Sequence, residues 1–464
     1  MSIVETIYNN SPIFIQNVMC SLYGLKLYRE RYSGRWKDYY KQLLLSQFFD
    51  RNQLEDHQRV ALKNTVLQAL KYVPYYKESD NYKIDYNAIK DISDLRKLPI
   101  LEKKTLRKFN DHFISEKFKN DKLIKVNTSG TTGTPITVFL SKDARKMNYA
   151  FFARSKKWAG IEGFEKNITF AGRTIVSPLQ TKPPFWRKNI ITNNTLFSSY
   201  HISMENSQAY INQIKRVKPV FIDSYPSSIF NLATYMVKNN IKINAKSIIT
   251  SAETLFEHQR EIIEKAFNCK VYDQYGSAEQ VVFACQCEYG KYHLNSEYGI
   301  LEVLDDDNNP VKIGETGNFI CTGFTNPAMP LLRFKIGDKG SLTDEVCKCG
   351  RNFPVIAKIE GREDDTLITP DGRYIGRLDP IFKGLENTII ETQIIQKTID
   401  LLVIKIVKTP EYKNDHGNFI INELKKRMGT NINYRIDYVD KINRTRSGKF
   451  RAVISDINKH DLNR

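Results

Sequence analysis

The chain has 464 residues, of which 41% are hydrophobic and 11% aromatic, enough apolar material for packed interiors and a length that favours two or three domains. The 26% share of charged residues is typical of globular proteins and argues against a disordered or fibrous chain. The net charge of +18 is spread along the chain, which indicates solvated faces and no nucleic-acid module. No apolar run approaches the roughly 20 residues of a membrane span, and Met1 to Ser11 lacks the apolar core of a secretory signal, so we expect a cytoplasmic protein.

Residues 1 to about 90 are expected to be helical. Apolar residues recur at three- and four-residue spacing over Ile13–Tyr28, Trp36–Phe49 and Leu54–Lys71. The first segment is mildly amphipathic and has basic residues at or just past its end, at Lys26, Arg29 and Arg31. We expect it to pack against the protein body, as short amphipathic helices usually do, and contact with a membrane surface is the alternative.

From Leu123 onward, strand-like and helix-like runs alternate, a pattern typical of an α/β layered domain. Two strands are expected at Leu123–Val126 and Ile136–Leu140, and a long helix at Ala144–Trp158. The later runs are Ile168–Ala171, Gln208–Arg216, Val220–Ile222, Ser227–Lys238, Ser247–Ser251, Phe256–Phe267 and Lys270–Tyr272.

The chain becomes β-rich after Tyr298, and its last part is predicted to be a small α+β unit. Strands are expected over Leu401–Val407 and Tyr434–Val439, and a helix over Gly417–Met428.

The best domain boundary is a glycine-led charged turn, Gly361-Arg362-Glu363-Asp364-Asp365. We therefore predict an N-terminal domain over residues 1–362 and a C-terminal domain over residues 363–464.

A loop rich in hydroxyl groups and glycine lies between the two first predicted strands, with the sequence Thr128-Ser129-Gly130-Thr131-Thr132-Gly133-Thr134-Pro135. Glycine lets a backbone approach phosphate oxygens closely, and hydroxyl and N–H groups donate hydrogen bonds to them. The loop lacks the G-x-x-x-x-G-K-[ST] order of a Walker loop. It is either a phosphate-binding loop or an ordinary hairpin turn, where serine and glycine are also common.

Four later segments favour phosphate binding. Tyr275-Gly276-Ser277-Ala278-Glu279 follows a predicted strand and ends in a carboxylate suited to magnesium. Asp338 ends the segment Arg333–Asp338 and can accept hydrogen bonds from ribose hydroxyls. The turn at 361–365 has the composition of a hinge, and Lys449 ends a glycine-bearing loop from which it can act as a mobile point charge. The alternative for the Glu279 and Asp338 segments is an ordinary turn in each case. The alternative for the turn at 361–365 is a solvated linker, and for Lys449 it is a surface lysine.

In this order and at these separations, the five segments resemble the acyl-adenylate-forming superfamily of acyl-CoA synthetases, adenylation domains and luciferases. Within it, the chain is most similar to the phenylacetate–CoA ligase family and its capsule-biosynthesis branch of CapK-type proteins. The resemblance covers nearly the whole chain and includes four further motifs: Val73-Pro74-Tyr75-Tyr76, Leu98-Pro99-Ile100-Leu101, Ser224-Tyr225-Pro226-Ser227 and Thr250-Ser251-Ala252-Glu253. It implies an α/β fold with a large adenylate-forming N-terminal domain of several subdomains and a small, mobile α+β C-terminal domain.

The resemblance also implies roles for single residues. Lys449, Glu279 and Thr128 would be catalytic, with Lys449 reaching the carboxylate and the α-phosphate and Glu279 binding magnesium. Asp364 would be the pivot about which the C-terminal domain rotates between two half-reactions. The loop would hold the ATP phosphates, residues 252–253 and 275–276 would frame the adenine, and Asp338 and Arg362 would contact the ribose. The full nucleotide-binding set besides Thr128 is Ser129, Gly130, Thr131, Thr132, Gly133, Ala252, Glu253, Tyr275, Gly276, Ser277, Asp338 and Arg362.

Two positions depart from the common pattern of the superfamily. Ile136 follows the loop proline where many members have lysine, although the phenylacetate–CoA ligase branch often lacks that lysine too. The C-terminal lysine segment begins Asn443-Arg444 where a proline–arginine pair is common. The first departure supports placing the chain in the phenylacetate–CoA ligase branch, and the second is a minor difference.

Seven cysteines in a chain expected in the cytoplasm argue against a disulfide framework. Three thiolates and an imidazole suited to tetrahedral zinc come from Cys287, His293, Cys347 and Cys349, with Cys285 as a possible substitute for Cys287. Such a zinc ion would be structural and would staple the region 285–349. The alternative is a set of packed, reduced cysteines with a solvated histidine.

The predicted activity is activation of a carboxylic acid by ATP and magnesium as an acyl-adenylate, with pyrophosphate release and then acyl transfer to CoA. The resemblance makes capsule or surface polysaccharide biosynthesis the candidate pathway. Alternatives are acyl transfer to a sugar amine or hydroxyl, adenylyl transfer to a non-carboxylate acceptor, and a catalytically weak, nucleotide-binding polysaccharide-assembly or membrane-peripheral factor. Intact Glu279, Asp338 and Lys449 favour an enzyme. Residues between about Tyr149 and Ser277 are expected to form the acid pocket, without identifying the acid.

Overall fold

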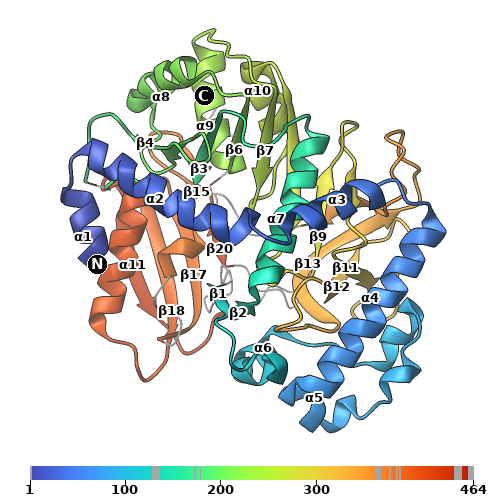
Figure 1. The fold of residues 1–464 in the computed structure, drawn as a ribbon. Coiled ribbons are helices and arrows are strands. Elements are labelled where there is room, and N and C mark those ends of the chain that lie inside the picture. The colour runs from blue at the N-terminus through green and yellow to red at the C-terminus, as the bar shows by residue number, and fades with distance from the viewer. Residues whose placement is uncertain are drawn as a thin grey trace.

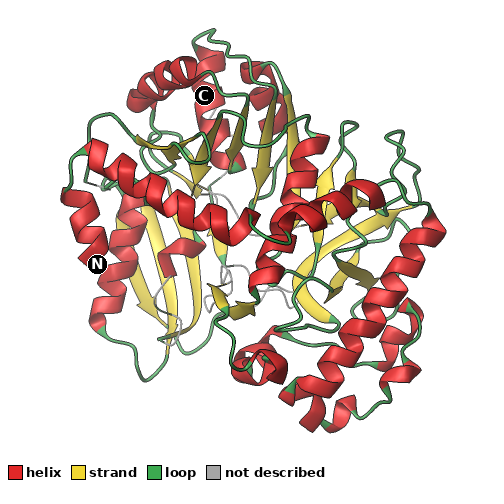
Figure 2. Ribbon diagram, viewed as in Figure 1, coloured by secondary structure: helices red, strands yellow, loops and turns green. Residues whose placement is uncertain are grey.

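The computed structural model describes residues 3–127, 136–171, 174–177, 179–360, 367–375, 378–382, 385, 388–443 and 452–457. It has an α/β architecture, in which a long mixed sheet with helices packed on it is followed by a smaller C-terminal α+β unit (Figures 1 and 2). The predicted fold class is therefore confirmed.

The N-terminal residues form helices, close to the predicted bounds. These helices are α1 (Ile3–Asn10), α2 (Ile13–Tyr32), α3 (Trp36–Ser46), α4 (Arg51–Tyr72), α5 (Pro74–Glu78) and α6 (Lys103–Lys108). α4 begins earlier than predicted because Asp50 and Gln53 form a capping box, in which each side chain accepts a hydrogen bond from the backbone N–H of the other. Such a box satisfies N–H groups that the start of a helix leaves without partners. The prediction missed α1, whose eight residues are too few for a distinctive period.

A twelve-stranded sheet lies at the centre of the molecule, with the strand order β11-β12-β13-β14-β10-β9-β8-β7-β6-β3-β5-β4. In chain order its strands are β3 (Asn167–Ala171), β4 (Trp186–Asn189), β5 (Asn194–Ser198), β6 (Phe221–Ser224), β7 (Ser247–Ser251), β8 (Lys270–Gly276), β9 (Phe283–Gln286), β10 (Tyr292–Leu294), β11 (Gly299–Leu304), β12 (Gly317–Gly323), β13 (Phe334–Thr343) and β14 (Val355–Glu360). The run β5-β3-β6-β7-β8 is parallel, and the remaining pairs are antiparallel.

Helices connect the parallel strands because a parallel pair needs a crossover. They are α8 (Met204–Val217), α9 (Pro226–Lys238) and α10 (Glu257–Phe267), and α7 (Lys142–Trp158) precedes β3. Buried Ile222 and Ile248 of the strands share one core with Ile229 of α9 and Phe267 of α10. The predicted alternation is confirmed, whereas the β4–β5 hairpin was missed because its strands are short and largely polar.

A separate hairpin of β1 (Ile124–Asn127) and β2 (Thr137–Leu140) precedes the sheet. The C-terminal unit contains β15 (Leu367–Ile368), β16 (Tyr374–Ile375), β17 (Ile389–Thr398), β18 (Leu401–Lys408), α11 (Asn414–Met428), β19 (Asn433–Tyr438) and β20 (Val453–Ser455). Its four-stranded sheet has the order β19-β18-β17-β20, and Ile420 and Leu424 of α11 pack on Leu402 and Ile404 of β18. Among the described helices, none combines the length and the apolar character needed to cross a membrane.

A buried ion pair joins the helical layer to the sheet. Arg154 of α7 donates hydrogen bonds to both carboxylate oxygens of Glu297, at 2.7 and 3.1 Å, and to the Leu43 carbonyl of α3 at 2.9 Å. Ser46 of α3 donates to the same carboxylate at 2.6 Å. Burial alone would raise the pKa of Glu297, but the Arg154 guanidinium and the Ser46 hydroxyl outweigh it, so that the pKa is lowered.

Replacing Glu297 with Gln should destabilise the protein strongly, because it leaves a fully buried guanidinium without a counter-charge. We expect a loss of about 3–5 kcal/mol in the free energy of unfolding, measured by urea denaturation near pH 7. The matched control is Asp56→Asn, which breaks an exposed ion pair with Arg59 and should cost less than about 1 kcal/mol. Equal losses in the two variants would contradict the role of the buried pair.

The Glu297→Gln variant should also change how the free energy of unfolding depends on pH. A lowered pKa means that the Glu297 carboxylate stabilises the fold fully above the usual glutamate range near 4.3 and progressively less as the pH falls below it. The Gln variant should therefore lose less stability than the wild type between about pH 5 and pH 3.

Candidate functional site

Several sequence motifs meet where the parallel strands end. β6 ends in Ser224, β7 in Ser251 and β8 in Gly276, and the parallel registers place these carboxyl ends at one edge of the sheet. From β3 the chain continues to β4 and β5, which lie on one side of β3 in the strand order, and then to β6, which lies on the other side of β3. In open α/β sheets, ligands bind outside the carboxyl ends of the strands at such a reversal. The sheet therefore places the motifs at 224–227, 250–253 and 275–279 where a ligand is expected.

Glu253 ties two of these motifs together. Its carboxylate accepts hydrogen bonds from the backbone N–H of Ser227 at 2.9 Å and from the Ser227 hydroxyl at 3.1 Å. The start of α9 has no side-chain cap at Tyr225, so the Glu253 carboxylate satisfies an N–H group there. Ala252, just before it, has a left-handed backbone with φ of 71°. The structure thus shows that Ser227 holds the Glu253 carboxylate in place. The position of Glu253 beside the adenine remains a prediction.

A hydrogen bond brings the predicted ribose contact to the end of β8. The Tyr275 hydroxyl donates to the Asp338 carboxylate at 2.8 Å, although β8 and β13 are not neighbours in the sheet. The ring of Tyr275 also packs edge-on against Phe319 of β12. Gly337 precedes Asp338 with φ of 87°, a conformation that glycine adopts without strain.

Two motifs of the sequence hold the chain that leads to Asp338. Tyr76 accepts a hydrogen bond from the backbone N–H of Leu332 at 3.2 Å and donates one to the Pro330 carbonyl at 3.3 Å. Leu101 exchanges backbone hydrogen bonds with Arg333 and Lys335, each 3.0 Å long. The motifs at 73–76 and 98–101 therefore act as supports for β13.

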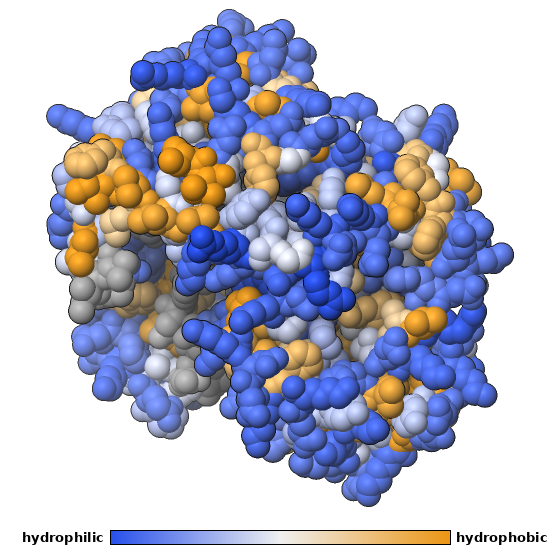
Figure 3. All heavy atoms as spheres, viewed as in Figure 1, coloured by the Kyte–Doolittle hydropathy of each residue, from blue (hydrophilic) through white to orange (hydrophobic). Residues whose placement is uncertain are grey.

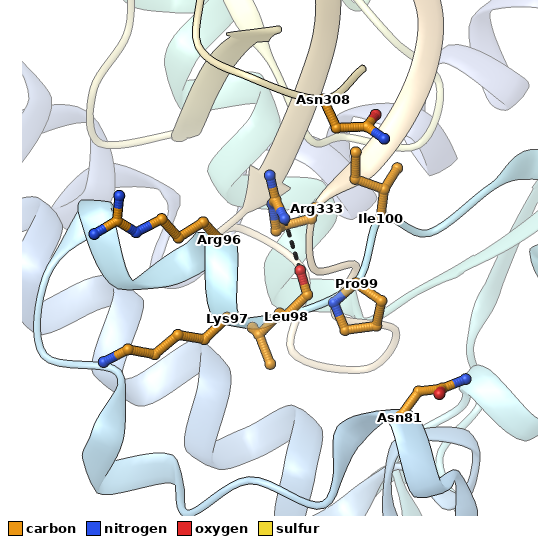
Figure 4. Close-up of a pocket in the computed structure, with 8 residues that line it drawn as sticks. All are labelled: Asn81, Arg96, Lys97, Leu98, Pro99, Ile100, Asn308 and Arg333. Atoms are coloured by element: carbon orange, nitrogen blue, oxygen red, sulfur yellow. Dashed lines mark hydrogen bonds between the residues drawn. The ribbon is translucent and has the colours of Figure 1, made fainter. Parts of the chain in front are cut away.

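A surface hollow of about 400 Å³ lies beside the motif at 98–101 (Figure 4). Arg333 lies at this hollow and is buried; it donates to the Leu98 carbonyl at 2.6 Å and to both oxygens of Glu302 at 3.0 Å. Because Glu302 neutralises the charge of Arg333, the arginine holds neighbouring segments of the chain together, and this hollow is not the candidate site.

Glu279 is a buried carboxylate with only 5% of its surface exposed. Within the described part of the chain, no residue forms a hydrogen bond or an ion pair with it. The Ser277 hydroxyl and the Gln280 side-chain carbonyl are buried nearby without hydrogen-bond partners as well. Buried polar groups are nearly always satisfied, so the unpartnered oxygens of Ser277 and Gln280 beside Glu279 indicate a place for a ligand.

The two predicted carboxylates both act on one buried thiol. Burial raises the pKa of the Cys321 thiol in β12, and the neighbouring charges of Asp338 and Glu279 raise it further. Both carboxylates therefore lie close to the same buried thiol, and the site has a negative field that favours a cation.

The β1–β2 hairpin presents the predicted phosphate loop, which itself lies outside the described residues. Nine residues, 128–136, separate the paired Asn127 and Thr137, which is longer than a tight hairpin turn. The Thr137 hydroxyl donates to the Asn127 side chain at 3.0 Å and closes the stem. Val138 of β2 belongs to the same hydrophobic core as Val281 and Val282, which follow Glu279.

The remaining predicted residues also lie outside the described parts of the chain. They are Thr128, Ser129, Gly130, Thr131, Thr132, Gly133, Arg362, Asp364 and Lys449.

Two features of the site were not found from the sequence. Asp273 of β8 accepts hydrogen bonds from Thr250 at 2.5 Å and Tyr292 at 2.6 Å, and burial raises its pKa to about 6. Tyr200 accepts a hydrogen bond from Arg427 of the C-terminal unit at 3.4 Å, with the guanidinium 4.9 Å from the ring centre. The run Val-Tyr-Asp-Gln at Asp273 gives only a strand signal, and nothing local links Tyr200 to a residue more than 200 positions away.

The predicted metal ligands converge in space. Cys287 follows β9, His293 lies on β10, and Cys347 and Cys349 lie on the turn between β13 and β14. Their four ligand atoms lie within 4.8 Å of one another, with 3.6 Å between the Cys287 and Cys347 sulfurs and 3.2 Å between the Cys349 sulfur and His293 Nε2. Cys285, the possible substitute, is not part of this cluster and instead contacts the Asn295 amide.

The chain is similar to known proteins. Residues 367–456 match the family model of the CapK C-terminal domain. The chain is 31% identical to Protein CapK of Staphylococcus aureus, over 97% of this chain and 99% of that protein. It is 24% identical to the phenylacetate-coenzyme A ligase of Thermus thermophilus, over 87% of this chain and 97% of the ligase.

A solved structure shares the fold. The structure of 2-hydroxyisobutyryl-CoA ligase in complex with 2-HIB-AMP and CoA aligns with a TM-score of 0.58 and 17% identity, over 90% of this chain and 93% of that one. The same ligase in the postadenylation state aligns with a TM-score of 0.56. The chain therefore belongs to the CapK family, is similar in sequence to a phenylacetate-coenzyme A ligase, and shares the fold of an acyl-CoA ligase.

Proposed function

We propose that this protein activates a carboxylic acid with ATP and then transfers the acyl group to CoA. The observation that carries the proposal is Glu279, a buried carboxylate without a partner among the described residues, at the ligand-binding edge of the sheet. No described residue forms an ion pair with the Glu279 carboxylate, and carboxylate oxygen is the ligand that Mg²⁺ prefers. A metal ion bound there would neutralise phosphate charge.

The proposed reaction has two steps. In the first, a carboxylate oxygen of the acid attacks the α-phosphorus of ATP, the bond from that phosphorus to the bridging oxygen breaks, and pyrophosphate leaves. In the second, the thiolate of CoA attacks the acyl carbon, and AMP leaves with the bonding electron pair.

Charge neutralisation is the main task in the first step, because it brings two anions together. Lys449 would supply a positive charge to the carboxylate and the α-phosphate, and the loop from Thr128 to Gly133 would donate hydrogen bonds to the phosphates. Asp338, held by Tyr275, would accept hydrogen bonds from the ribose, together with Arg362.

A moving C-terminal domain would separate the two steps. We assign residues 1–362 and 363–464 to the two domains and place the pivot at Asp364. Rotation would withdraw Lys449 after adenylation and expose the adenylate to the thiol. In the arrangement of the structure, Arg427 of the C-terminal unit contacts Tyr200 of the N-terminal domain, a contact that a large rotation would break.

A sugar amine or hydroxyl is the second candidate acceptor, in the assembly of a capsule or surface polysaccharide. It is favoured by the higher identity to CapK, at 31%, than to the phenylacetate-coenzyme A ligase, at 24%. The two acceptors make different products from the same adenylate, so the first step is common to both.

The activity should appear as acid-dependent pyrophosphate release in a panel of aryl, fatty and hydroxy acids with ATP and Mg²⁺. We expect Lys449→Ala and Glu279→Gln each to lower the rate by at least about a hundredfold, because each removes a charge that the first step needs. Matched controls are Lys441→Ala and Glu205→Gln, at exposed positions, which should leave the rate unchanged.

The acceptors are then compared in reactions with the acid that gives the highest rate of pyrophosphate release. Adding CoA should produce a thioester and AMP, and an amino sugar in its place should produce no acyl product. Unchanged rates in the Lys449 and Glu279 variants would contradict their roles. Binding of ATP without pyrophosphate release from any acid would favour a nucleotide-binding factor over a ligase.

We also propose that the cluster of Cys287, His293, Cys347 and Cys349 binds a structural Zn²⁺ ion. A tetrahedral site with Zn–S distances of about 2.3 Å and Zn–N distances near 2.0 Å has ligand atoms about 3.5–3.8 Å apart, close to the separations observed. Trp158 and Phe353 pack beside His293 and shield the cluster. The ion would staple the β9–β10 hairpin to the turn between β13 and β14.

The purified protein should contain about one equivalent of zinc per chain by mass spectrometry of the metal. A Cys347→Ser/Cys349→Ser variant should contain less than about a tenth of that amount and unfold at a lower temperature, because two of four ligands are lost. The matched control is Cys269→Ser, since Cys269 is isolated from the cluster. Zinc far below one equivalent in the wild type would overturn the proposal.

A further inference from the structure

α2 packs on the protein with its polar face and turns apolar side chains to solvent. The buried positions of this helix are Gln16, Ser21 and Gly24. Phe14, Val18 and Leu22, spaced by four residues, form another line along the helix, and this line faces solvent. Their exposed fractions are 69%, 54% and 62%. This is the reverse of the usual arrangement, and it differs from our expectation that the apolar face would serve a core.

Polar contacts with the β4–β5 hairpin fix the orientation of α2. Gln16 accepts a hydrogen bond from the Arg187 guanidinium, and the Asn17 side chain accepts one from the backbone N–H of Lys188 at 2.8 Å. The Ser21 hydroxyl accepts from the backbone N–H of Ile190 at 3.3 Å. A Cβ atom at Gly24 would overlap the Asn189 side chain, so the helix lies very close to the strand. The outward direction of Phe14, Val18 and Leu22 therefore follows from specific contacts.

Further apolar residues extend this line into a surface patch. The apolar α2 patch consists of Ile7, Phe14, Ile15, Val18, Leu22, Tyr23 and Ile190, all exposed. Figure 3 shows hydrophobic residues gathered over the N-terminal half of α2. Contiguous exposed apolar surface of this kind marks an interaction site in a protein that is otherwise covered by polar side chains.

Basic side chains border the apolar α2 patch. Lys26 and Arg29 follow it along the helix, and Lys188 is exposed on β4 beside Asn17. The nearest acid along the helix, Glu30, lies 4.0 Å from Lys26. The chain as a whole has a net charge of +18. The partner of this surface should therefore be apolar in the middle and negative around it.

We propose that the apolar α2 patch docks the protein on an anionic membrane surface. A helix lying in the interface buries its apolar face at the boundary of headgroups and acyl chains, while lysine and arginine contact anionic lipid. Nucleic acid does not fit, because the centre of the patch offers phosphates only apolar side chains. A second copy of the chain has the same basic border and the same net charge of +18, which oppose self-association through this face.

The proposal is tested by co-sedimentation of the full-length protein with vesicles of phosphatidylcholine alone or with phosphatidylglycerol added. The wild type should bind the vesicles that contain phosphatidylglycerol, and should bind less at high salt. The triple variant Phe14→Ser/Val18→Ser/Leu22→Ser should bind at least about tenfold more weakly, because it loses the side chains that insert. Arg29→Gln/Lys188→Gln should weaken binding only to the anionic vesicles.

The matched control replaces Leu45, Val60 and Ile313 with serine, since these side chains are exposed to a similar extent elsewhere on the surface. It should bind as the wild type does, and circular dichroism should show that all variants are folded. Equal loss of binding in the control triple, or no preference for anionic vesicles, would overturn the proposal. So would a dimer in sedimentation equilibrium that the Phe14 triple variant abolishes while the vesicles stay unbound.

Discussion

The hydrogen bond between Tyr275 and Asp338 joins the two halves of the sheet at the candidate site. The two residues are 63 positions apart in the chain, and their strands β8 and β13 have β9, β10 and β14 between them in the sheet order. The antiparallel part must therefore curl until β13 faces the carboxyl ends of the parallel strands. The buried Cys321 thiol then lies near both Asp338 and Glu279, whose charges raise its pKa.

Much of the molecule serves to hold this arrangement. Tyr76 and Leu101 fix the segment that enters β13, and Glu253 fixes the start of α9 beside β7. Arg154 and Glu297 join the helical layer to the turn before β11. At the candidate site, by comparison, the Ser277 hydroxyl and the Gln280 side-chain carbonyl are buried without hydrogen-bond partners, beside Glu279. A buried polar group without a partner is costly unless a ligand binds it.

Two features of the N-terminal part of the chain lie outside the candidate site and extend the function proposed for it. The cysteine–histidine cluster would brace the β9–β10 hairpin, which directly follows the Glu279 segment, so a metal ion there would support the site from behind. The apolar α2 patch would place the enzyme at a membrane surface. Both depend on residues that are far apart in the chain and meet only after folding.

The sequence by itself determined the class of fold, the order of its elements and the types of residue at the site. The spacing of apolar residues was sufficient for the helices α4, α7 and α9, and short, largely buried runs were sufficient for the strands β7 and β18. Local patterns also singled out Glu279, Asp338 and the four metal-ligand positions. They missed α1, β4 and β5, which are short or polar at the edge of the sheet, and they gave no sign of the contact between Tyr200 and Arg427.

Only the tertiary structure decided which of these residues meet. It placed Asp338 against Tyr275, chose Cys287 over Cys285 for the metal cluster, and gave Glu253 to the start of α9. It also turned the apolar residues of α2 outward, which the sequence pattern did not predict. The physical reason is the same in each case: periodicity shows that one face of an element is distinct, but the partner available in space decides which face is buried. For α2 that partner is a polar strand edge at Arg187 and Lys188, so the polar side of the helix faces the protein.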